Sequence, residues 1–180
     1  SKIKYIVIGG SAGSFRVITR ILSELPEDFP LPIILCLHRL KHVRTGFVEA
    51  LQFKSKLKVK EPFDKEAIKK STIYLAPANY HLLVELGNTF SLSIADSVNH
   101  SRPSIDLTFE SAADTFKSKL IGILLSGANK DGAKGIEKVK QNLGITVVQD
   151  PKDSQNKTMP QAAIDTGKVD YIYDVERIII

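Results

Sequence analysis

One serine lies between a short apolar run and an amphipathic stretch, in the sequence Gly9-Gly10-Ser11-Ala12-Gly13. The pattern predicts a strand, a tight turn and a helix, because small residues let the backbone turn without a clash at Cβ. Three interpretations of this turn compete. It is a plain connection, or it holds a phosphate on the free N–H groups of a helix start. Alternatively it presents Ser11 as a nucleophile, since the sequence fits the G-x-S-x-G pattern.

The phosphate interpretation lacks features that it needs. A dinucleotide-binding fold has an acidic residue at the end of its second strand, which holds the ribose hydroxyl. This chain has Leu37-His38-Arg39 at that place, and the third glycine of the G-x-G-x-x-G pattern is missing. A G-x-x-x-x-G-K-[ST] phosphate loop is absent as well. The sequence therefore argues against a nucleotide ligand.

The nucleophile interpretation gains support from two further side chains. A serine hydroxyl needs a base, and histidine is the side chain that titrates near neutral pH. His38 follows the second predicted strand, and Asp131 follows a later one, where its carboxylate can orient the imidazole. We therefore predict Ser11, His38 and Asp131 as the catalytic residues. No metal and no cofactor are expected, and the single Cys36 excludes a cysteine-rich zinc site.

The elements that must position these residues follow from the apolar pattern. Strands alternate with helical stretches, which is typical of βαβ units with parallel strands. We predict an α/β fold with a doubly wound, mostly parallel sheet, helices on both faces and an antiparallel edge hairpin. Ligands bind beyond the C-terminal ends of the strands in such sheets, so the three catalytic residues are expected at one edge.

The predicted element boundaries are as follows. Strands are expected at residues 3–9, 33–37, 57–60, 72–77, 120–125, 145–149 and 169–173, with the hairpin at 81–94. Helices are expected at about residues 14–25, 43–53, 105–117, 133–142 and 160–165. Ser104 is expected to cap the helix that follows it.

Length and composition predict one globular catalytic domain over residues 1–180. Hydrophobic residues make up 43% of the chain and charged residues 25%, which is ordinary for such domains. No apolar run has the length of a membrane span, and no secretion leader precedes the first strand. We therefore expect a cytoplasmic protein without membrane insertion. The net charge of +5 fits an acidic partner, and no nucleic-acid partner is expected.

Six ordered motifs, spread over essentially the whole chain, resemble one family. Residues 8–14 (Ile-Gly-Gly-Ser-Ala-Gly-Ser) are similar to its Ile-Gly-Ala-Ser-x-Gly-Gly pattern, and residues 37–40 (Leu-His-Arg-Leu) stand where it has Gln-His-Met-Pro. Residues 76–81, 101–106, 125–133 and 159–163 are similar to its Ala-Pro-x-x-x-His, Arg-Pro-Ser-Val-Asp, Leu-Thr-Gly-Met-Gly-x-Asp-Gly-Ala and Met-Pro-x-x-Ala runs. With these motifs the chain resembles the catalytic domain of the CheB-type chemotaxis protein-glutamate methylesterases.

The resemblance implies a serine esterase that hydrolyses the γ-methyl esters of glutamate on the cytoplasmic helices of methyl-accepting chemoreceptors. Some members of the family also deamidate glutamine. Carried over by motif, Ser11 is the nucleophile, His38 is the base and Asp131 is the acid that orients it. Four further residues are expected near the substrate or the oxyanion: Ala12, Gly13, Arg102 and Ala128.

Three departures from the family pattern lie close to these residues. Ser14 replaces the second glycine after the serine, Arg39-Leu40 replaces Met-Pro, and Ala128 replaces a methionine. They leave open the alternative of a non-catalytic CheB-like binding module that keeps the fold.

The usual member of the family also has an N-terminal receiver domain, and none precedes the first predicted strand here. We therefore expect residues 1–180 to be a catalytic domain alone, with a separate receiver or regulator protein as a candidate partner. The three remaining histidines are expected to be structural or at the surface: His42, His81 and His100.

Overall fold

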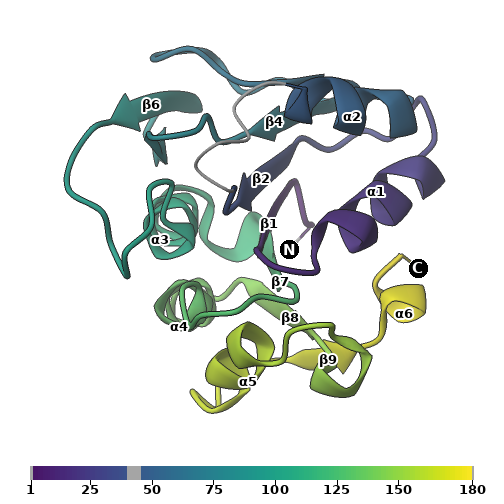
Figure 1. The fold of residues 1–180 in the computed structure, drawn as a ribbon. Coiled ribbons are helices and arrows are strands. Elements are labelled where there is room, and N and C mark those ends of the chain that lie inside the picture. Colours follow the sequence, from purple (N-terminus) through teal and green to yellow (C-terminus); the bar gives the residue numbers. More distant parts are fainter. Residues whose placement is uncertain (1, 40–45, 180) are drawn as a thin grey trace.

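The structure is a computed structural model, and it describes residues 2–39 and 46–179 (Figure 1). Its main strands are β1 (Tyr5–Gly10), β2 (Ile33–Leu37), β3 (Lys58–Lys60), β4 (Thr72–Leu75), β7 (Leu120–Leu124), β8 (Ile145–Gln149) and β9 (Tyr171–Tyr173). Within the described residues these strands form one sheet in the order β3-β4-β2-β1-β7-β8-β9. All neighbouring strands in it are parallel. The predicted parallel α/β sheet is thus confirmed.

Helices cover both faces of this sheet, as Figure 1 shows. One face packs against α1 (Phe15–Glu24), α2 (Phe47–Lys54) and α6 (Val175–Ile179). The other face packs against α3 (Ile105–Phe116), α4 (Ala133–Gln141) and α5 (Thr158–Ile164). The described residues also form two short 3₁₀ turns: η1 (Lys117–Lys119) and η2 (Pro151–Asp153).

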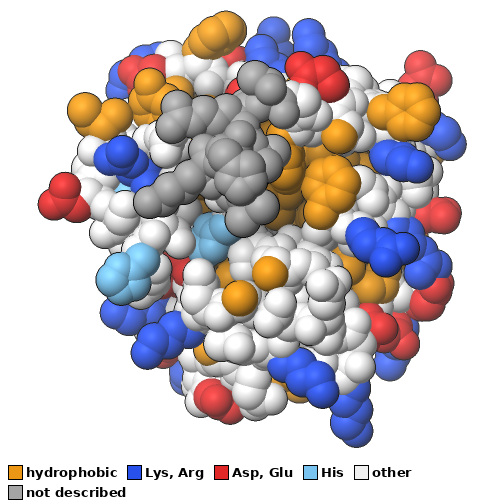
Figure 2. Space-filling view, in the orientation of Figure 1, with side chains coloured by type: hydrophobic (Ala, Val, Ile, Leu, Met, Phe, Trp, Pro, Cys, Tyr) orange, Lys and Arg blue, Asp and Glu red, His pale blue; other side chains and the backbone are white. Residues whose placement is uncertain are grey.

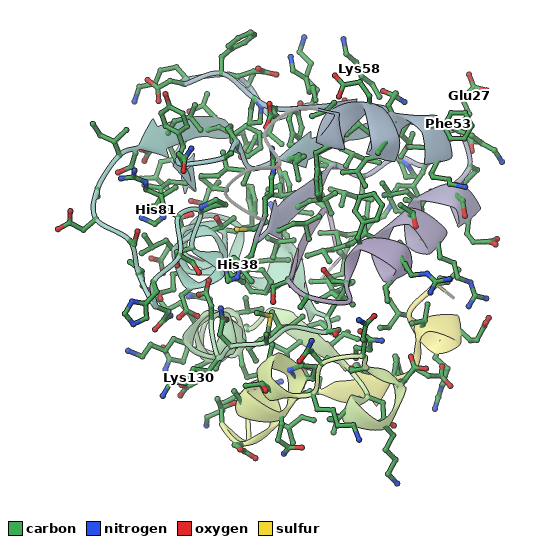
Figure 3. All side chains as sticks on the ribbon, in the orientation of Figure 1. Glu27, His38, Phe53, Lys58, His81 and Lys130 are labelled. Atoms are coloured by element: carbon green, nitrogen blue, oxygen red, sulfur yellow. The ribbon has the colours of Figure 1, made fainter. Side chains whose placement is uncertain are left out.

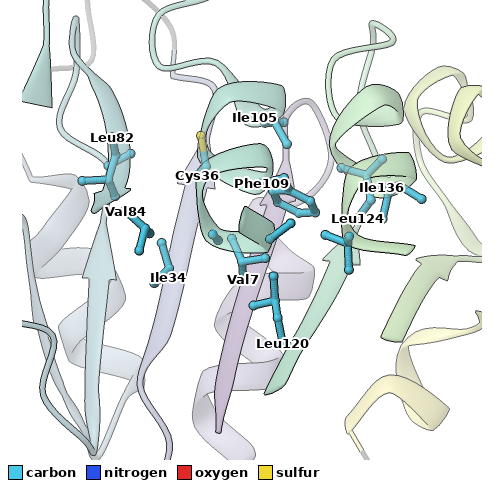
Figure 4. Close-up of a cluster of buried hydrophobic side chains, with 14 of the residues drawn as sticks. Val7, Ile34, Cys36, Leu82, Val84, Ile105, Phe109, Leu120, Leu124 and Ile136 are labelled. Atoms are coloured by element: carbon cyan, nitrogen blue, oxygen red, sulfur yellow. The ribbon is translucent and has the colours of Figure 1, made fainter. Parts of the chain in front are cut away.

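The central strands are apolar at every position because both of their faces are buried. Val7 points into the core beneath α3, whereas its neighbour Ile8 packs against the layer of α1. In β2, Ile34 and Cys36 share the core with Val7 (Figure 4). This arrangement explains the unbroken apolar runs in the sequence, since side chains alternate between two covered faces.

The predicted hairpin is present as β5 (His81–Glu85) and β6 (Thr89–Ser93), but it forms a separate two-stranded sheet. It packs against α3 instead of extending the main sheet. Side chains of α3 hold its backbone: Thr108 Oγ1 donates to Leu82 O at 2.7 Å, and Ser111 Oγ accepts from Val84 N at 2.9 Å. Leu82 and Val84 are buried in the same core as Phe109.

The helices depart from the prediction mainly at α2 and α6. Helix α2 begins at Phe47, and residues 43–45 of the predicted helix lie outside the described residues. Helix α6 was not predicted, although Asp174 gives a capping signal by accepting from Arg177 N at 3.0 Å. None of the helices in the described part of the chain is both long enough and apolar enough to cross a membrane.

Helix α3 lies unusually close to β1 and α4. A Cβ atom on Gly9 would stand 2.6 Å from Ile105 Cγ2, and a Cβ on Gly135 would stand 2.5 Å from Phe109 Cβ. Real Cβ atoms do not approach other carbons so closely, so both positions require glycine. The close approach places the first residues of α3 beside the loop after β7.

We expect Gly135→Ala to destabilise the protein, although alanine normally favours a helix interior by about 1 kcal/mol over glycine. The new methyl group would overlap Phe109 Cβ, which the backbone of α3 fixes in place. Overpacking of this kind costs about 1–3 kcal/mol, so the urea midpoint should fall. Lys134→Ala, at an exposed position of the same helix, is the matched control and should leave the midpoint unchanged. A raised midpoint for Gly135→Ala would contradict the close packing.

Candidate active site

The loops after β4, β2, β1 and β7 lie side by side, because these parallel strands are neighbours in that order. Ser11 follows β1, His38 follows β2, and Asp131 lies in the loop after β7. All three therefore belong to one edge of the sheet. Figure 3 shows His38 between the end of β2 and helix α3. In the surface view of Figure 2, a histidine lies near the centre and the acidic side chains lie mainly toward the rim.

His38 and Asp131 form a hydrogen-bonded pair in the interior. His38 Nε2 lies 2.8 Å from Asp131 Oδ2, and the two side chains are 14% and 0% exposed. Asp131 also accepts the backbone N–H groups of Ile105 at 2.7 Å and of Asp106 at 2.9 Å. Burial alone would raise the pKa of Asp131, but the hydrogen bonds from His38, Asp106 and Ile105 outweigh it and lower that pKa below its ordinary value.

Asp106 has the reciprocal arrangement. Its Oδ1 accepts the backbone N–H groups of Gly132 at 2.9 Å and of Gly135 at 2.8 Å, at the start of α4. Its Oδ2 accepts from Asn99 Nδ2 at 3.0 Å. Burial raises the pKa of Asp106, and the nearby charge of Asp131 adds to that rise, against the hydrogen bonds from Gly135 and Gly132. Asp106 thus positions the loop that carries Asp131.

Sequence reasoning missed Asp106 as part of the site, although it lies in the motif at 101–106. Its one local signal is an acidic residue in the first turn of a helix, which many helices have. Ser104, by contrast, was predicted as the cap of α3 and is confirmed, since its Oγ accepts from Leu107 N at 3.2 Å.

The bond to Asp131 fixes the tautomer of His38. An ionised carboxylate only accepts hydrogen bonds, so the proton between the two groups is carried by Nε2. The other ring nitrogen, Nδ1, then keeps its lone pair and is the basic atom of the imidazole. The side-chain nitrogen of Asn129 lies 3.4 Å from Nδ1 and donates to it. His38 is therefore oriented as a base with Nδ1 as the acceptor.

Ser11 lies close to the loop after β7. Its Oγ accepts from Ala128 N at 3.1 Å, and its own backbone N–H donates to Ser126 O at 2.9 Å. A Cβ on Gly127 would lie 2.6 Å from Ser11 Oγ, so only glycine allows this approach. Ser11 and His38, both of them described, form no hydrogen bond with each other, because the serine hydroxyl is turned toward Ala128.

The turn around Ser11 accounts for one departure from the family pattern. Ser14 is 2% exposed, and its Oγ donates to the carbonyl oxygen of Ser11 at 2.6 Å. Its backbone is in the right-handed helical region, so the position does not need glycine. Gly13 does, since its φ of 84° lies in the left-handed region and a Cβ there would stand 2.6 Å from Gln155 Cβ.

The other residues predicted near the substrate or the oxyanion lie either beside Ser11 or beside His38. Ala12 and Ala128 are exposed, and within the described residues the N–H groups of Ala12 and Gly13 have no acceptor. Those two N–H groups and that of Ala128 can therefore receive an oxyanion. Arg102 lines a pocket that also contains His38, and its Nη1 donates to Ile94 O at 2.9 Å and Ala95 O at 3.3 Å.

Among the other histidine and cysteine side chains with reactive potential, the buried ones support the fold. His81 is buried, with Nε2 2.9 Å from Asp96 O and Nδ1 accepting from Ser104 N at 3.1 Å, so it holds the segment before α3. His42 lies outside the described residues. Cys36 is fully buried, and burial raises the pKa of its thiol well above the ordinary value. Residues 2–39 and 46–179 contain no cluster of histidine, cysteine or acidic side chains suited to a metal ion.

Known proteins share this whole architecture. The sequence profile of the CheB methylesterase family matches residues 6–179. A Leptospira interrogans protein, provisionally named protein-glutamate methylesterase/protein-glutamine glutaminase, is 45% identical over 96% of this chain and 90% of its own length. The protein of that name from Thermotoga maritima is 36% identical over 97% of this chain, which spans about half of that relative, 52%. The crystal structure of the Thermotoga maritima CheB methylesterase catalytic domain is also similar, with a TM-score of 0.93 and 35% identity over 99% of this chain and 96% of that one.

We expect neutral His38 to carry its proton on Nε2, because the buried carboxylate of Asp131 accepts it. The measurement is a two-bond ¹H–¹⁵N correlation spectrum of the histidine rings, recorded at alkaline pH with neutral rings. His38 should show a protonated Nε2 and an unprotonated Nδ1. The opposite pattern, with the proton on Nδ1, would contradict the assignment of Nδ1 as the base.

We expect Gly127→Ala to impair Ser11 without unfolding the chain. The added methyl group must push away Ser11 Oγ and the flexible end of Met159. A displacement of about 1 Å at a reacting atom can cost about a hundredfold in rate. The readout is the rate at which a fluorophosphonate labels Ser11. Lys134→Ala, at an exposed position of α4 away from Ser11, is the control and should label at the parent rate. Equal rates for both variants would show that the contact does not matter.

Proposed function

The chain belongs to the CheB methylesterase family, and we propose that this esterase uses Ser11 as nucleophile, His38 as base and Asp131 as the acid that orients the base. The observation that carries the assignment is the buried bond of 2.8 Å between His38 Nε2 and Asp131 Oδ2, one strand away from Ser11. It supports a base held in a fixed tautomer, which is the arrangement that activates a serine hydroxyl.

The first half of the reaction transfers the acyl group to the enzyme. Ser11 Oγ attacks the carbonyl carbon of the γ-methyl ester, and its proton passes to His38 Nδ1. The bond between the carbonyl carbon and the methoxy oxygen then breaks, and His38 returns the proton to that oxygen. Methanol leaves, and a glutamyl ester of Ser11 remains. Asp131 stabilises the imidazolium that forms between the two proton transfers.

A rotation of the Ser11 hydroxyl links the resting arrangement to this step. At rest Ser11 Oγ accepts from Ala128 N, and His38 Nδ1 accepts from Asn129. Turning the hydroxyl toward Nδ1 frees the N–H of Ala128, which can then stabilise the oxyanion together with the N–H of Ala12. Such a change of one χ1 angle between staggered wells is an ordinary side-chain motion. The same rotation of the Ser11 side chain therefore places the nucleophile near its base and frees an N–H group for the oxyanion.

The second half of the reaction regenerates the serine. Water attacks the glutamyl ester while His38 takes its proton, and the ester bond to Ser11 then breaks with return of that proton to Oγ. A free glutamate carboxylic acid is released. A glutamine side chain can follow the same route with ammonia as the leaving group, which fits the second activity in the names of the relatives.

We assign the substrate to the cytoplasmic helices of methyl-accepting chemoreceptors, as the family resemblance implies. The net charge of +5 favours an acidic protein surface as partner. The exposed positions of Ala12 and Ala128, on either side of Ser11, leave room for a side chain presented on a helix. Ala128 replaces a larger family residue, so this edge is more open than the family pattern alone suggests.

We expect Ser11→Ala to reduce methanol release from methylated receptor by a factor on the order of 10⁶, because the nucleophile is lost. His38→Gln should cost nearly as much, since members of such a unit are not additive. Circular dichroism should show both variants folded. Ser23→Ala, an exposed serine in α1, is the matched control and should retain the parent rate.

Two results would contradict the proposal. Methanol release by Ser11→Ala at the parent rate would remove the nucleophile assignment. Binding of methylated receptor by the unchanged chain without any methanol release would instead favour the alternative of a non-catalytic binding module. The first result would contradict the role of Ser11, and the second would contradict the esterase activity itself.

A further inference from the structure

A pocket of about 250 Å³ opens beside the catalytic edge, on the side of His38 away from Ser11. Its walls come from the loop after β2, the loop after β4 and the segment before α3. The polar side chains that matter for its chemistry are His38, Arg39, Asn79, His100, Ser101 and Arg102. None of the described residues that line it is acidic.

The two guanidinium groups are not neutralised to the same extent. Arg39 is 4% exposed and pairs with Glu61 Oε2 at 2.7 Å, while it also donates to Ala76 O at 2.7 Å. Arg102 forms no ion pair with any described residue, and its contacts are the carbonyl oxygens of Ile94 and Ala95. The Nε atoms of Arg39 and Arg102 are both buried without a hydrogen-bond acceptor. The positive charge of Arg102 therefore has no acidic partner among the described residues, and each guanidinium group has an N–H donor without an acceptor.

A tight turn builds one wall of this pocket. Val98 and Ser101 pair across a two-residue turn in which Asn99 has φ of 51° and His100 has φ of 64°. Positive φ angles at both central residues are typical of a type I′ turn, and asparagine and histidine adopt them more readily than most residues other than glycine. The turn places Asn99 on Asp106 and leaves His100 lining the pocket.

We propose that this pocket binds a carboxylate of the substrate: a second acidic side chain on the helix that carries the methyl ester. Arginine forks and amide or hydroxyl donors bind carboxylates, and Arg102 has no acidic partner among the described residues. The volume is below the range of about 300–1,000 Å³ for sites of drug-sized ligands, and it suits the end of one side chain. The inference rests on the proposed function, because it takes the ester at Ser11 as its reference point.

The sheet sets the distance between the two bound groups. Ser11 follows β1, and the pocket lies between the loops after β2 and β4, up to two strands away. Two strand spacings of about 4.8 Å make about 10 Å. An α-helix rises about 1.5 Å per residue, so this distance corresponds to about seven residues. A helix lying across the strand ends would thus present the ester to Ser11 and an acidic side chain, two turns away, to Arg102.

The test compares helical peptides that contain one γ-methyl glutamate. A glutamate stands seven residues before or after the ester in one set, and glutamine replaces it in the matched set. Binding to the Ser11→Ala chain is measured by fluorescence anisotropy, and methanol release is measured with the unchanged chain. We expect glutamate to improve binding about tenfold or more, which is the effect of a hydrogen bond between charged groups.

Two variants locate the effect. Arg102→Gln should abolish the preference for glutamate over glutamine. Asn79→Asp should do the same by placing a carboxylate in the pocket, without disturbing the carbonyl contacts of Arg102. Arg177→Gln removes the same charge at α6, far from the pocket, and should keep the preference. Glutarate should displace the glutamate peptides only.

The possible results test the carboxylate-binding pocket independently of the proposed esterase activity. Equal binding of the glutamate and glutamine peptides by the Ser11→Ala chain would overturn the proposal. Binding of glutarate that depends on Arg102, with no preference between the peptides, would also overturn it, since the pocket would then hold a free anion. If neither peptide releases methanol from the unchanged chain, the proposed function fails, while the binding comparison still reports on the pocket.

Discussion

The site depends on two buried carboxylates, Asp131 and Asp106. Each accepts hydrogen bonds from the start of the helix next to the other carboxylate. Asp131, just before α4, accepts the first N–H groups of α3, and Asp106, in α3, accepts those of α4. Helix starts carry partial positive charge, which lets two acidic groups lie close together in a dry interior. Asp131 keeps its charge in this setting, and a charged Asp131 is what fixes the tautomer of His38.

The packing of the core serves the same end. Glycines at positions 9 and 135 let α3 approach both the sheet and α4 to distances at which no side chain would fit. Without that approach the N–H groups of α3 could not reach Asp131. The order β2-β1-β7 at the middle of the sheet then sets the three loops next to one another. Precision at the site thus comes from close contacts in the hydrophobic interior beneath it.

The sequence predicted much of this molecule because much of it is local. Apolar runs such as Ile33–Leu37 indicated buried parallel strands, and the motifs indicated the family, which the comparisons confirm. The role of Asp106 was not predicted, because the backbone N–H groups that it accepts, those of Gly132 and Gly135, lie 26 and 29 residues away in the sequence. The separate hairpin depends on Thr108 and Ser111, which no strand pattern involves. The departure at Arg39 also became interpretable only with Glu61 and Ala76 O beside it.

The hairpin β5–β6 lies within the connection between β4 and α3, outside the main sheet. The segments on either side of it, with Asn79 and with Arg102, line the pocket beside His38. Insertions or deletions in this connection can therefore accumulate over evolution without shifting the register of the strands that precede Ser11, His38 and Asp131. Such modularity allows descendants of one ancestral hydrolase to diverge in what they recognise while inheriting the same chemistry.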